Sequence, residues 1–276
     1  MQKVLNRFQT VILVVVAGIL LTQPVMASFN LAWQRFQEGD FQSAHDNWKI
    51  MAEKGHAPSQ LNLGLLLSRG LGVEQNQEEA VNWFKRAAES DYLPAIYNLG
   101  VMYREGRGVA ADAARSTELF RTAAQGGNSY GHLALGLAYL NEVGVAQDLR
   151  EGLILVKLAA EQGNSLAQYE LAVMYERGQF VERNMVRAAE LYQSAAAGGI
   201  AEAGFRLGLF YTRGIETEED LIRSYFWFSV AEIYGHAEAR SALATQRQMM
   251  TEDQLARANW LVETQQFRSL QLSPLN

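Results

Sequence analysis

Residues 61–73 read LNLGLLLSRGLGV, and this pattern returns along the chain every 36 residues. The further copies read YNLGVMYREGRGV (97–109), LALGLAYLNEVGV (133–145), YELAVMYERGQFV (169–181) and FRLGLFYTRGIET (205–217). A fixed period of this length is typical of solenoids, in which one unit cannot bury its own apolar face and must stack on its neighbours. The sequence therefore predicts an all-α solenoid with a 36-residue period.

Each unit is predicted to hold two helices. In the first full copy, the apolar residues of 58–69 occupy most of the helical circumference, as expected for a first helix (helix A) that is packed on several sides. Gly70 and Gly72 favour termination of this helix, because glycine adopts the left-handed conformation found at helix C-termini. A glycine inside helix A costs about 1 kcal/mol of helix propensity. We therefore expect close contact with the second helix at Gly64, Gly100, Gly136 and Gly208.

The second helix (helix B) is predicted to begin after a recurring Asp or Asn. The side chain at such a position accepts a hydrogen bond from a free backbone N–H of the first turn. An acid three residues later, as at Glu79 and Glu151, can complete a capping box. A ladder of metal-binding acids is the alternative, but two members are Asn, so we interpret the column as structural. Its members are Asp40, Asn76, Asp112, Asp148, Asn184 and Asp220.

The complete pattern resembles the Sel1-like repeat, a relative of the tetratricopeptide repeat. The resemblance covers roughly residues 29–236. In the second copy it rests on Ala95, Leu99, Gly100, Tyr103, Gly106, Gly108, Val109, Asp112, Phe120, Ala123, Ala124 and Gly127. It implies antiparallel helix pairs stacked into a right-handed superhelix, which acts mainly as a scaffold for protein partners. The chain departs from the pattern at Ala172 and in the loops GQFVERN (178–184) and GIETEED (214–220).

The N-terminal segment differs from the repeats. Residues 1–27 are predicted to be a signal peptide, because Lys3 and Arg7 precede an apolar run and the residues before position 28 suit cleavage after Ala27. A membrane anchor is the alternative. However, the apolar run from Val11 to Leu21 is too short, since a spanning helix needs about 20 apolar residues.

The remaining chain divides into three parts by its relation to the period. Residues 28–56 are predicted to form a divergent helical hairpin. Residues 236–276 are predicted to form capping helices and a tail, with a capping box at Thr251 and Gln254 before the last helix. The five repeats between them are expected at 57–91, 92–127, 128–163, 164–199 and 200–235.

The composition narrows the possible functions. The sequence contains no cysteine, which excludes disulfides, thiolate metal sites and lipid attachment at a processed N-terminal cysteine. Cleavage of residues 1–27 removes two of the 24 basic residues and none of the 30 acidic ones, so the mature net charge is −8. Such an acidic chain is a poor candidate for binding nucleic acid or anionic lipid. Because of the signal, we expect a periplasmic or secreted protein with no transmembrane segment after cleavage.

The sequence offers no motif for catalysis. It contains no G-x-S-x-G, Walker loop, H-E-x-x-H or S-x-x-K pattern. His56 and His236 occupy one turn column, and His132 has no acid or second histidine at the helical spacing of a metal site. We therefore predict a non-enzymatic protein without catalytic, metal-binding or cofactor-binding residues.

The residues that the repeat pattern does not explain lie on one stripe of helix A, at positions i, i+3, i+4 and i+7. By analogy with related repeats, we hypothesise that this stripe faces the concave side and binds a protein or peptide partner. Its arginines would attract an acidic segment, and its methionines would give adaptable apolar contact. Core packing is the alternative, most of all for the methionines and the phenylalanine. The predicted contact residues are Arg69, Asn98, Met102, Glu105, Met174, Arg177, Arg206, Phe210 and Arg213.

Two other functions stay open at this point. The first is an envelope glycan or peptidoglycan-binding module, in which Tyr103, Tyr139, Tyr175 and Tyr211 would serve as stacking platforms, although this column is also the packing tyrosine of the family. The second is an accessory subunit of an envelope machine, a motor or a secretion assembly. The sequence identifies neither the partner nor the oligomeric state.

Overall fold

The computed structural model describes residues 27–213 and 218–271, and all its regular secondary structure there is helical. The signal peptide predicted over 1–27 lies almost entirely outside the described residues, as do Gly214 in the second irregular loop and the tail from 272. No helix in the described ranges is both long and apolar enough to cross a membrane. Contacts group the chain into two compact units, which are residues 1–131 with 143–145 (unit 1) and residues 132–142 with 146–276 (unit 2).

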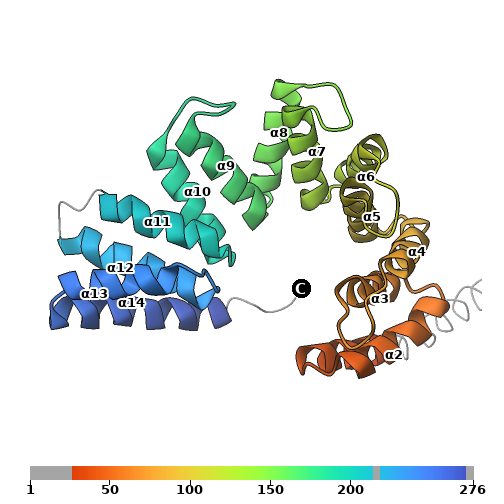
Figure 1. The fold of residues 1–276 in the computed structure, drawn as a ribbon, viewed down its shortest axis with the longest axis horizontal. Coiled ribbons are helices and arrows are strands. Elements are labelled where there is room, and N and C mark those ends of the chain that lie inside the picture. Colours follow the sequence, from red (N-terminus) through yellow and green to blue (C-terminus); the bar gives the residue numbers. More distant parts are fainter. Residues whose placement is uncertain (1–26, 214–217, 272–276) are drawn as a thin grey trace, which may run out of the picture. The chain divides into compact units, whose positions relative to one another are not determined.

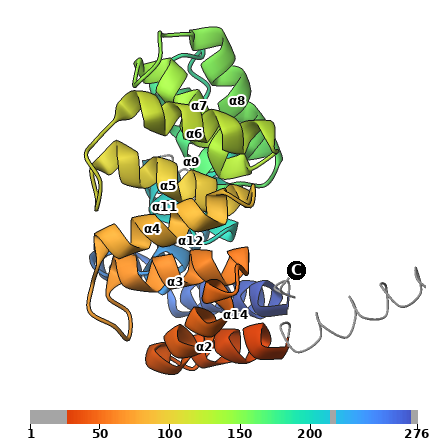
Figure 2. The ribbon, with the colours of Figure 1, turned by 90° about the vertical axis from the view of Figure 1, so that its right-hand side faces the viewer.

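Unit 1 contains the divergent hairpin and the first two repeats. Its helices are residues 27–37, α2 (Phe41–Glu53), α3 (Ala57–Arg69), α4 (Gln77–Ala88), α5 (Leu93–Glu105) and α6 (Ala113–Gln125). From α2 onward, each helix packs against the next one along the chain, as Figure 1 and Figure 2 show. The core of this unit includes Trp48, Phe84 and Phe120, all buried.

Unit 2 continues the same arrangement. The helix α7 (Ser129–Asn141) begins at the boundary, and it is followed by α8 (Leu149–Glu161), α9 (Ser165–Arg177), α10 (Met185–Ala197), α11 (Ala201–Arg213), α12 (Glu218–Ile233), α13 (Ala239–Met249) and α14 (Glu252–Gln271). Successive helices from α8 to α13 pack in order, and α14 returns to pack on α12. Helix A of the five repeats is thus α3, α5, α7, α9 and α11, and helix B is α4, α6, α8, α10 and α12. The predicted all-α solenoid is confirmed.

Five of the six predicted caps form, at 2.9 to 3.1 Å from the backbone N–H three residues later. The sixth is wrong, because α12 begins at Glu218 and Asp220 therefore lies inside the helix. A run of acids (218–220) at this end suits a helix N-terminus and favours the earlier start.

The capping boxes expected at Glu79 and Glu151 do not form. The backbone N–H of Asn76 donates instead to the carbonyl of Leu67 at 2.9 Å, and the N–H of Asp148 donates to a helix A carbonyl in the same way. The box between Thr251 and Gln254 does form, with hydrogen bonds of 2.9 and 3.3 Å.

The glycine column inside helix A has the predicted cause. A Cβ atom at Gly100 would lie 2.6 Å from Cε1 of Phe120, and one at Gly208 would lie 2.4 Å from Cδ1 of Phe228. Only a residue without a side chain lets the helix B ring pack directly on the helix A backbone. The fourth copy differs, because Ala172 stands in the glycine column and Tyr192 in the aromatic one.

Candidate functional site

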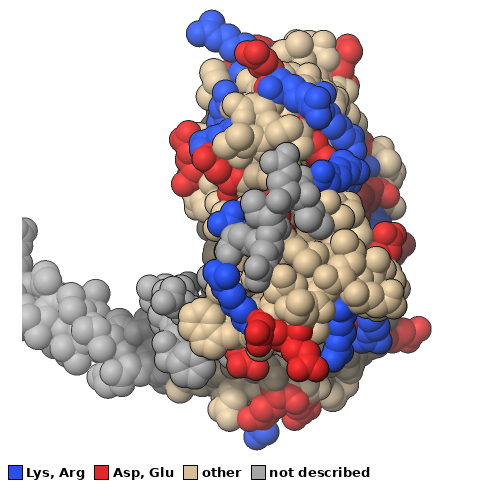
Figure 3. Space-filling view, turned by 90° about the vertical axis from the view of Figure 1, so that its left-hand side faces the viewer, with Lys and Arg blue, Asp and Glu red and all other residues tan. Residues whose placement is uncertain are grey.

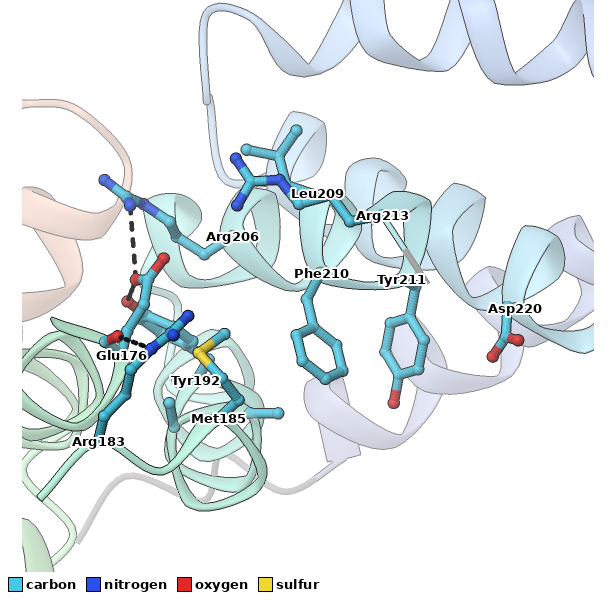
Figure 4. A pocket seen from close by; sticks show the side chains of 12 residues that line it. Glu176, Arg183, Met185, Tyr192, Arg206, Leu209, Phe210, Tyr211, Arg213 and Asp220 are labelled. Carbon is cyan, nitrogen blue, oxygen red and sulfur yellow. Dashed lines mark hydrogen bonds and ion pairs between the residues drawn. The ribbon is translucent and has the colours of Figure 1, made fainter. Parts of the chain in front are cut away.

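A groove of about 460 Å³ in unit 2 lies where α9, α10 and α11 meet. The helix A residues of the fifth copy form one wall, and helix B of the fourth copy forms the other (Figure 4). The lining residues are Glu176, Arg183, Met185, Ala188, Ala189, Tyr192, Arg206, Leu209, Phe210, Tyr211, Arg213 and Asp220.

One wall of the groove is apolar and aromatic. Leu209, Phe210 and Tyr211 follow one another on α11, and each is half-buried. The Phe210 and Tyr211 rings meet edge to face, with centroids 5.4 Å apart, and Figure 4 shows both rings pointing from α11 in the same direction. Rigid rings of this kind give large contact area at low entropic cost.

The floor of the groove holds a charged network. Nε of Arg206 lies 2.8 Å from a carboxylate oxygen of Glu202, and its Nη1 lies 3.5 Å from Oε2 of Glu176. The Tyr192 hydroxyl donates to the same Glu176 oxygen. Burial, and then this hydrogen bond, raise the pKa of Tyr192, so the hydroxyl stays protonated. The hydrogen bond to Glu202 raises the pKa of Arg206. Arg206 is therefore a compensated cation.

A histidine extends the network to the turn after α12. Nε2 of His236 lies 2.9 Å from the second carboxylate oxygen of Glu202, and its ring stacks on Phe205 with centroids 4.0 Å apart. Partial burial acts to raise the pKa of Glu202, but the hydrogen bonds from Arg206 and His236 outweigh it and lower the pKa below the ordinary 4.5.

The lowered pKa of Glu202 predicts a contribution to acid stability. The ionised group stabilises the fold above its unfolded-state pKa, and this contribution disappears as pH falls through the lower folded-state value. Since the side chain is 39% exposed, we expect Glu202→Gln to lower the free energy of unfolding at neutral pH by at most about 1 kcal/mol. The difference from wild type should shrink as pH falls below the ordinary pKa of 4.5 and vanish below the lowered folded-state pKa of Glu202. Urea unfolding at several pH values measures it.

The matched control is Glu161→Gln, because no described basic side chain lies within ion-pair distance of this exposed carboxylate. A difference for Glu202→Gln that did not shrink on acidification would contradict the assignment of its effect to the carboxylate charge.

The structure brings three predicted contact residues together, since Arg206, Phe210 and Arg213 all line the groove. Two predictions are wrong. Met102 is 2% exposed and Met174 is 5% exposed, because helix A packs on both its own helix B and the neighbouring repeat and this stripe position faces the core. These methionines have no surface to offer a partner.

The other predicted residues lie outside the groove. Arg69, Asn98 and Glu105 belong to unit 1, where Asn98 donates to the carbonyl of Pro94 and Glu105 pairs with two neighbouring arginines. Arg177 is exposed on α9 and does not line the groove.

The arginines that were predicted to attract an acidic segment differ in their pairing. Arg206 is neutralised by two carboxylates, and Figure 3 shows both basic and acidic side chains on the face that it views. Arg183 and Arg213 differ from Arg206, because no described carboxylate lies within ion-pair distance of either guanidinium. Nε of Arg183 instead donates to the carbonyl of Glu176 at 3.1 Å.

Sequence reasoning missed the residues that helix B and the loop contribute. Arg183 lies in the irregular loop GQFVERN, which the broken repeat pattern did single out. Tyr192 gave a weaker signal, namely a tyrosine where the other four repeats carry phenylalanine or valine. Over residues 27–213 and 218–271, no three His, Asp or Glu side chains are placed to hold a metal ion.

Comparison with known proteins identifies the repeats. The family model described as Sel1 repeat matches residues 57–92, 93–128, 129–164, 165–200 and 201–231. A crystal structure of a Sel1 repeat protein from Oxalobacter formigenes superposes with a TM-score of 0.68 at 25% identity, covering 86% of this chain and 99% of that one.

Two further solved structures share the fold alone. An immunity protein from Pseudomonas aeruginosa has a TM-score of 0.53 at 23% identity and covers 78% of this chain and 82% of its own. A putative Sel1 repeat protein from Klebsiella pneumoniae has a TM-score of 0.52 at 18% identity, covering 74% and 99%. No curated protein matches the sequence.

Proposed function

The chain belongs to the Sel1 repeat family, and we propose that it is a non-enzymatic scaffold that binds a protein or peptide partner in the groove between α9, α10 and α11. The Sel1 fold typically serves protein interactions. The observation that carries the proposal is the lining of this groove, where half-buried Leu209, Phe210 and Tyr211 stand beside Arg213. Aromatic residues and arginine are the types that dominate binding energy at protein interfaces.

The partner segment is proposed to be acidic with an apolar anchor. Arg206 is paired with Glu202 and Glu176. Among the described lining residues, Arg183 and Arg213 are therefore the cations available to attract a carboxylate of the partner. Met185 on the opposite wall can adapt to an apolar side chain placed against Phe210.

The location is proposed to be the periplasm or the exterior, after cleavage of residues 1–27. The support is the order of a basic start, an apolar run and small residues before position 28. Cell fractionation with N-terminal sequencing tests it. We expect a mature N-terminus at Ser28, and retention of Met1 in the cytoplasmic fraction would contradict export.

The partner proposal is tested by placing a photoreactive amino acid at position 210 of the full chain in cells and identifying the cross-linked protein by mass spectrometry. With that partner purified, Arg213→Glu should weaken binding about tenfold, which corresponds to about 1.4 kcal/mol. Arg177→Glu is the matched control, because Arg177 is also exposed at the same repeat position but lies outside the groove. Equal loss in both variants would exclude the groove as the binding site.

The glycan alternative receives no support from the tyrosine column. Tyr103, Tyr139, Tyr175 and Tyr211 are all half-buried, as expected for a packing column. Retention of the full chain on purified peptidoglycan sacculi, abolished by Tyr211→Ala, would overturn the protein-partner proposal.

A further inference from the structure

The outer face of helix B is solvated in the second and fourth copies. On α6, Nη1 of Arg115 lies 2.7 Å from Oε2 of Glu118, and the Thr122 hydroxyl donates to the Glu118 carbonyl at 3.1 Å. The same set recurs at equal distances on α10, at Arg187, Glu190 and Ser194. These two copies show how this face is built when water is its neighbour.

The third copy breaks the arrangement. At the equivalent columns α8 carries Glu151, Ile154 and Leu158, so the ion pair and the hydroxyl are both gone. Ile154 is 48% exposed and Leu158 is 37% exposed. The two side chains lie one turn apart, at i and i+4, and form one contiguous apolar surface that we call the α8 face. Nothing in the described part of the chain covers it.

The fifth copy shows what an apolar version of these columns does in this protein. There the columns hold Phe226 and Val230, and α13 and α14 pack on α12. Phe226 is only 8% exposed, whereas its column is exposed in every earlier copy. In the fifth copy, the apolar residue of the Phe226 column thus lies on a helix that further helices cover.

The helix that covers α12 has a defined pattern. On α14, Leu255, Ala258 and Leu261 lie on one side at i, i+3 and i+6, and Ala258 is fully buried. A small residue at the centre allows the helix axes to approach closely, while flanking leucines fill the groove beside them. Trp260 on the other side is exposed. The template for coverage is thus an amphipathic helix with a small central residue.

We propose that the α8 face binds an amphipathic helix of a partner protein, in the way that α14 covers α12. A helix packed on Ile154 and Leu158 would bury apolar surface that is otherwise exposed to water. The second and fourth copies have polar side chains in these columns and expose no such surface. Arg150 and Lys157 lie along one edge of the face, and no described carboxylate pairs with either. The partner helix should therefore carry acidic residues along that edge. The apolar side of α14 is already packed on α12, so this helix of a second copy is not the proposed occupant.

The internal repeats supply a variant that should keep the fold. The triple substitution Glu151→Arg, Ile154→Glu and Leu158→Thr gives α8 the outer face of α6. It removes exposed apolar groups and adds an i, i+3 ion pair, so the free energy of unfolding should change by less than about 0.5 kcal/mol. Urea unfolding of the full chain checks this before any binding is measured.

The test uses photo-crosslinking of the full chain in cells. A photoreactive amino acid at position 158 should give a discrete heterologous adduct, with the cross-linked peptide on an amphipathic helical segment of the partner. The same residue at position 122 or 194 should give none. A synthetic peptide of that segment should bind the full chain at least about tenfold more weakly after Ile154→Glu. Arg213→Glu should leave the peptide affinity unchanged, which separates this surface from the groove.

Three outcomes would overturn the proposal. The first is an adduct with this chain itself, which would make the α8 face a self-association surface. The second is the same set of adducts from positions 122, 158 and 194, which would mean that the apolar pair has no selectivity. The third is the absence of any adduct at 158 in cells where position 210 yields its own.

Discussion

Replacing Gly108 with alanine should destabilise unit 1 by about 2–5 kcal/mol, in part through left-handed strain and in part through overlap with the preceding repeat. Gly108 adopts a φ of +65°, and a Cβ atom there would lie 2.2 Å from the carbonyl oxygen of Gln77 at the start of α4. That oxygen belongs to the backbone, so it cannot rotate away as a side chain would. Hydrogen exchange of the α4 to α6 amides measures the loss as a lower free energy of local opening.

The matched control is Gly127→Ala in the same repeat. Gly127 adopts a φ of +87°, but its added Cβ would meet nothing within 4 Å, so only the conformational cost of about 1–2 kcal/mol remains. Asp91 occupies the same column at a φ of 53°, which shows that a side chain fits there. Equal losses for the two variants would mean that the close approach to α4 contributes nothing.

The fourth copy holds a side chain in the column that Gly108 occupies in the second copy. Phe180 stands in the Gly108 column at a φ of 63° and lies partly buried against the core of unit 2. Together with Leu153, Lys157 and Tyr175 it lines a second cavity beside α8. The irregular loop that the sequence singled out is therefore a real departure, in which a strained aromatic residue replaces a glycine contact.

The helices and their ends were predictable because the signals for them are local. An Asx residue, a glycine and an apolar run determine where a helix begins, ends and packs within one or two turns. The 36-residue period repeats each of these signals, which makes their assignment more certain. The prediction for Asp220 failed because α12 starts at Glu218, three residues before the predicted start at Leu221, in a copy whose loop lacks the second glycine of the pattern. The capping boxes failed because a helix A carbonyl already takes the N–H that the acid would need.

The candidate site was less predictable because its ion pairs join residues from different repeats. The pairing of Arg206 with Glu202 lies within one helix and can be read at i, i+4, but Glu176 comes from the preceding helix A. Likewise, Met102 and Met174 share a stripe with Phe210, and only the packing of neighbouring repeats determines which of them is buried. Periodicity gives the face of a helix and not the depth to which each residue on it is covered.

Truncation of the ring beneath the glycine column should produce the other large effect. Phe120 is 2% exposed, and its ring packs on the backbone at Gly100 and against Tyr97, with ring centroids 5.7 Å apart. Phe120→Ala removes this filling and leaves a cavity between α5 and α6, so we expect a loss of about 3–5 kcal/mol in the stability of unit 1. Thr122→Ala, on the exposed side of α6, is the control and should change stability by less than about 0.5 kcal/mol.

A double-mutant cycle with Gly100 tests whether ring and glycine form one packing unit. In the wild-type background, Gly100→Ala drives a methyl group into the Phe120 ring and should cost about 1–3 kcal/mol. In the Phe120→Ala background that obstacle is absent, the new methyl group fills part of the cavity, and alanine is the better helix former by about 1 kcal/mol. The same substitution should therefore stabilise the protein there, and the coupling free energy should reach about 2 kcal/mol or more. Apart from Phe120, no side chain would lie within 3 Å of the Cβ atom that alanine adds at position 100. Additive effects in urea unfolding would therefore mean that packing of this ring is not the reason for the glycine at this position.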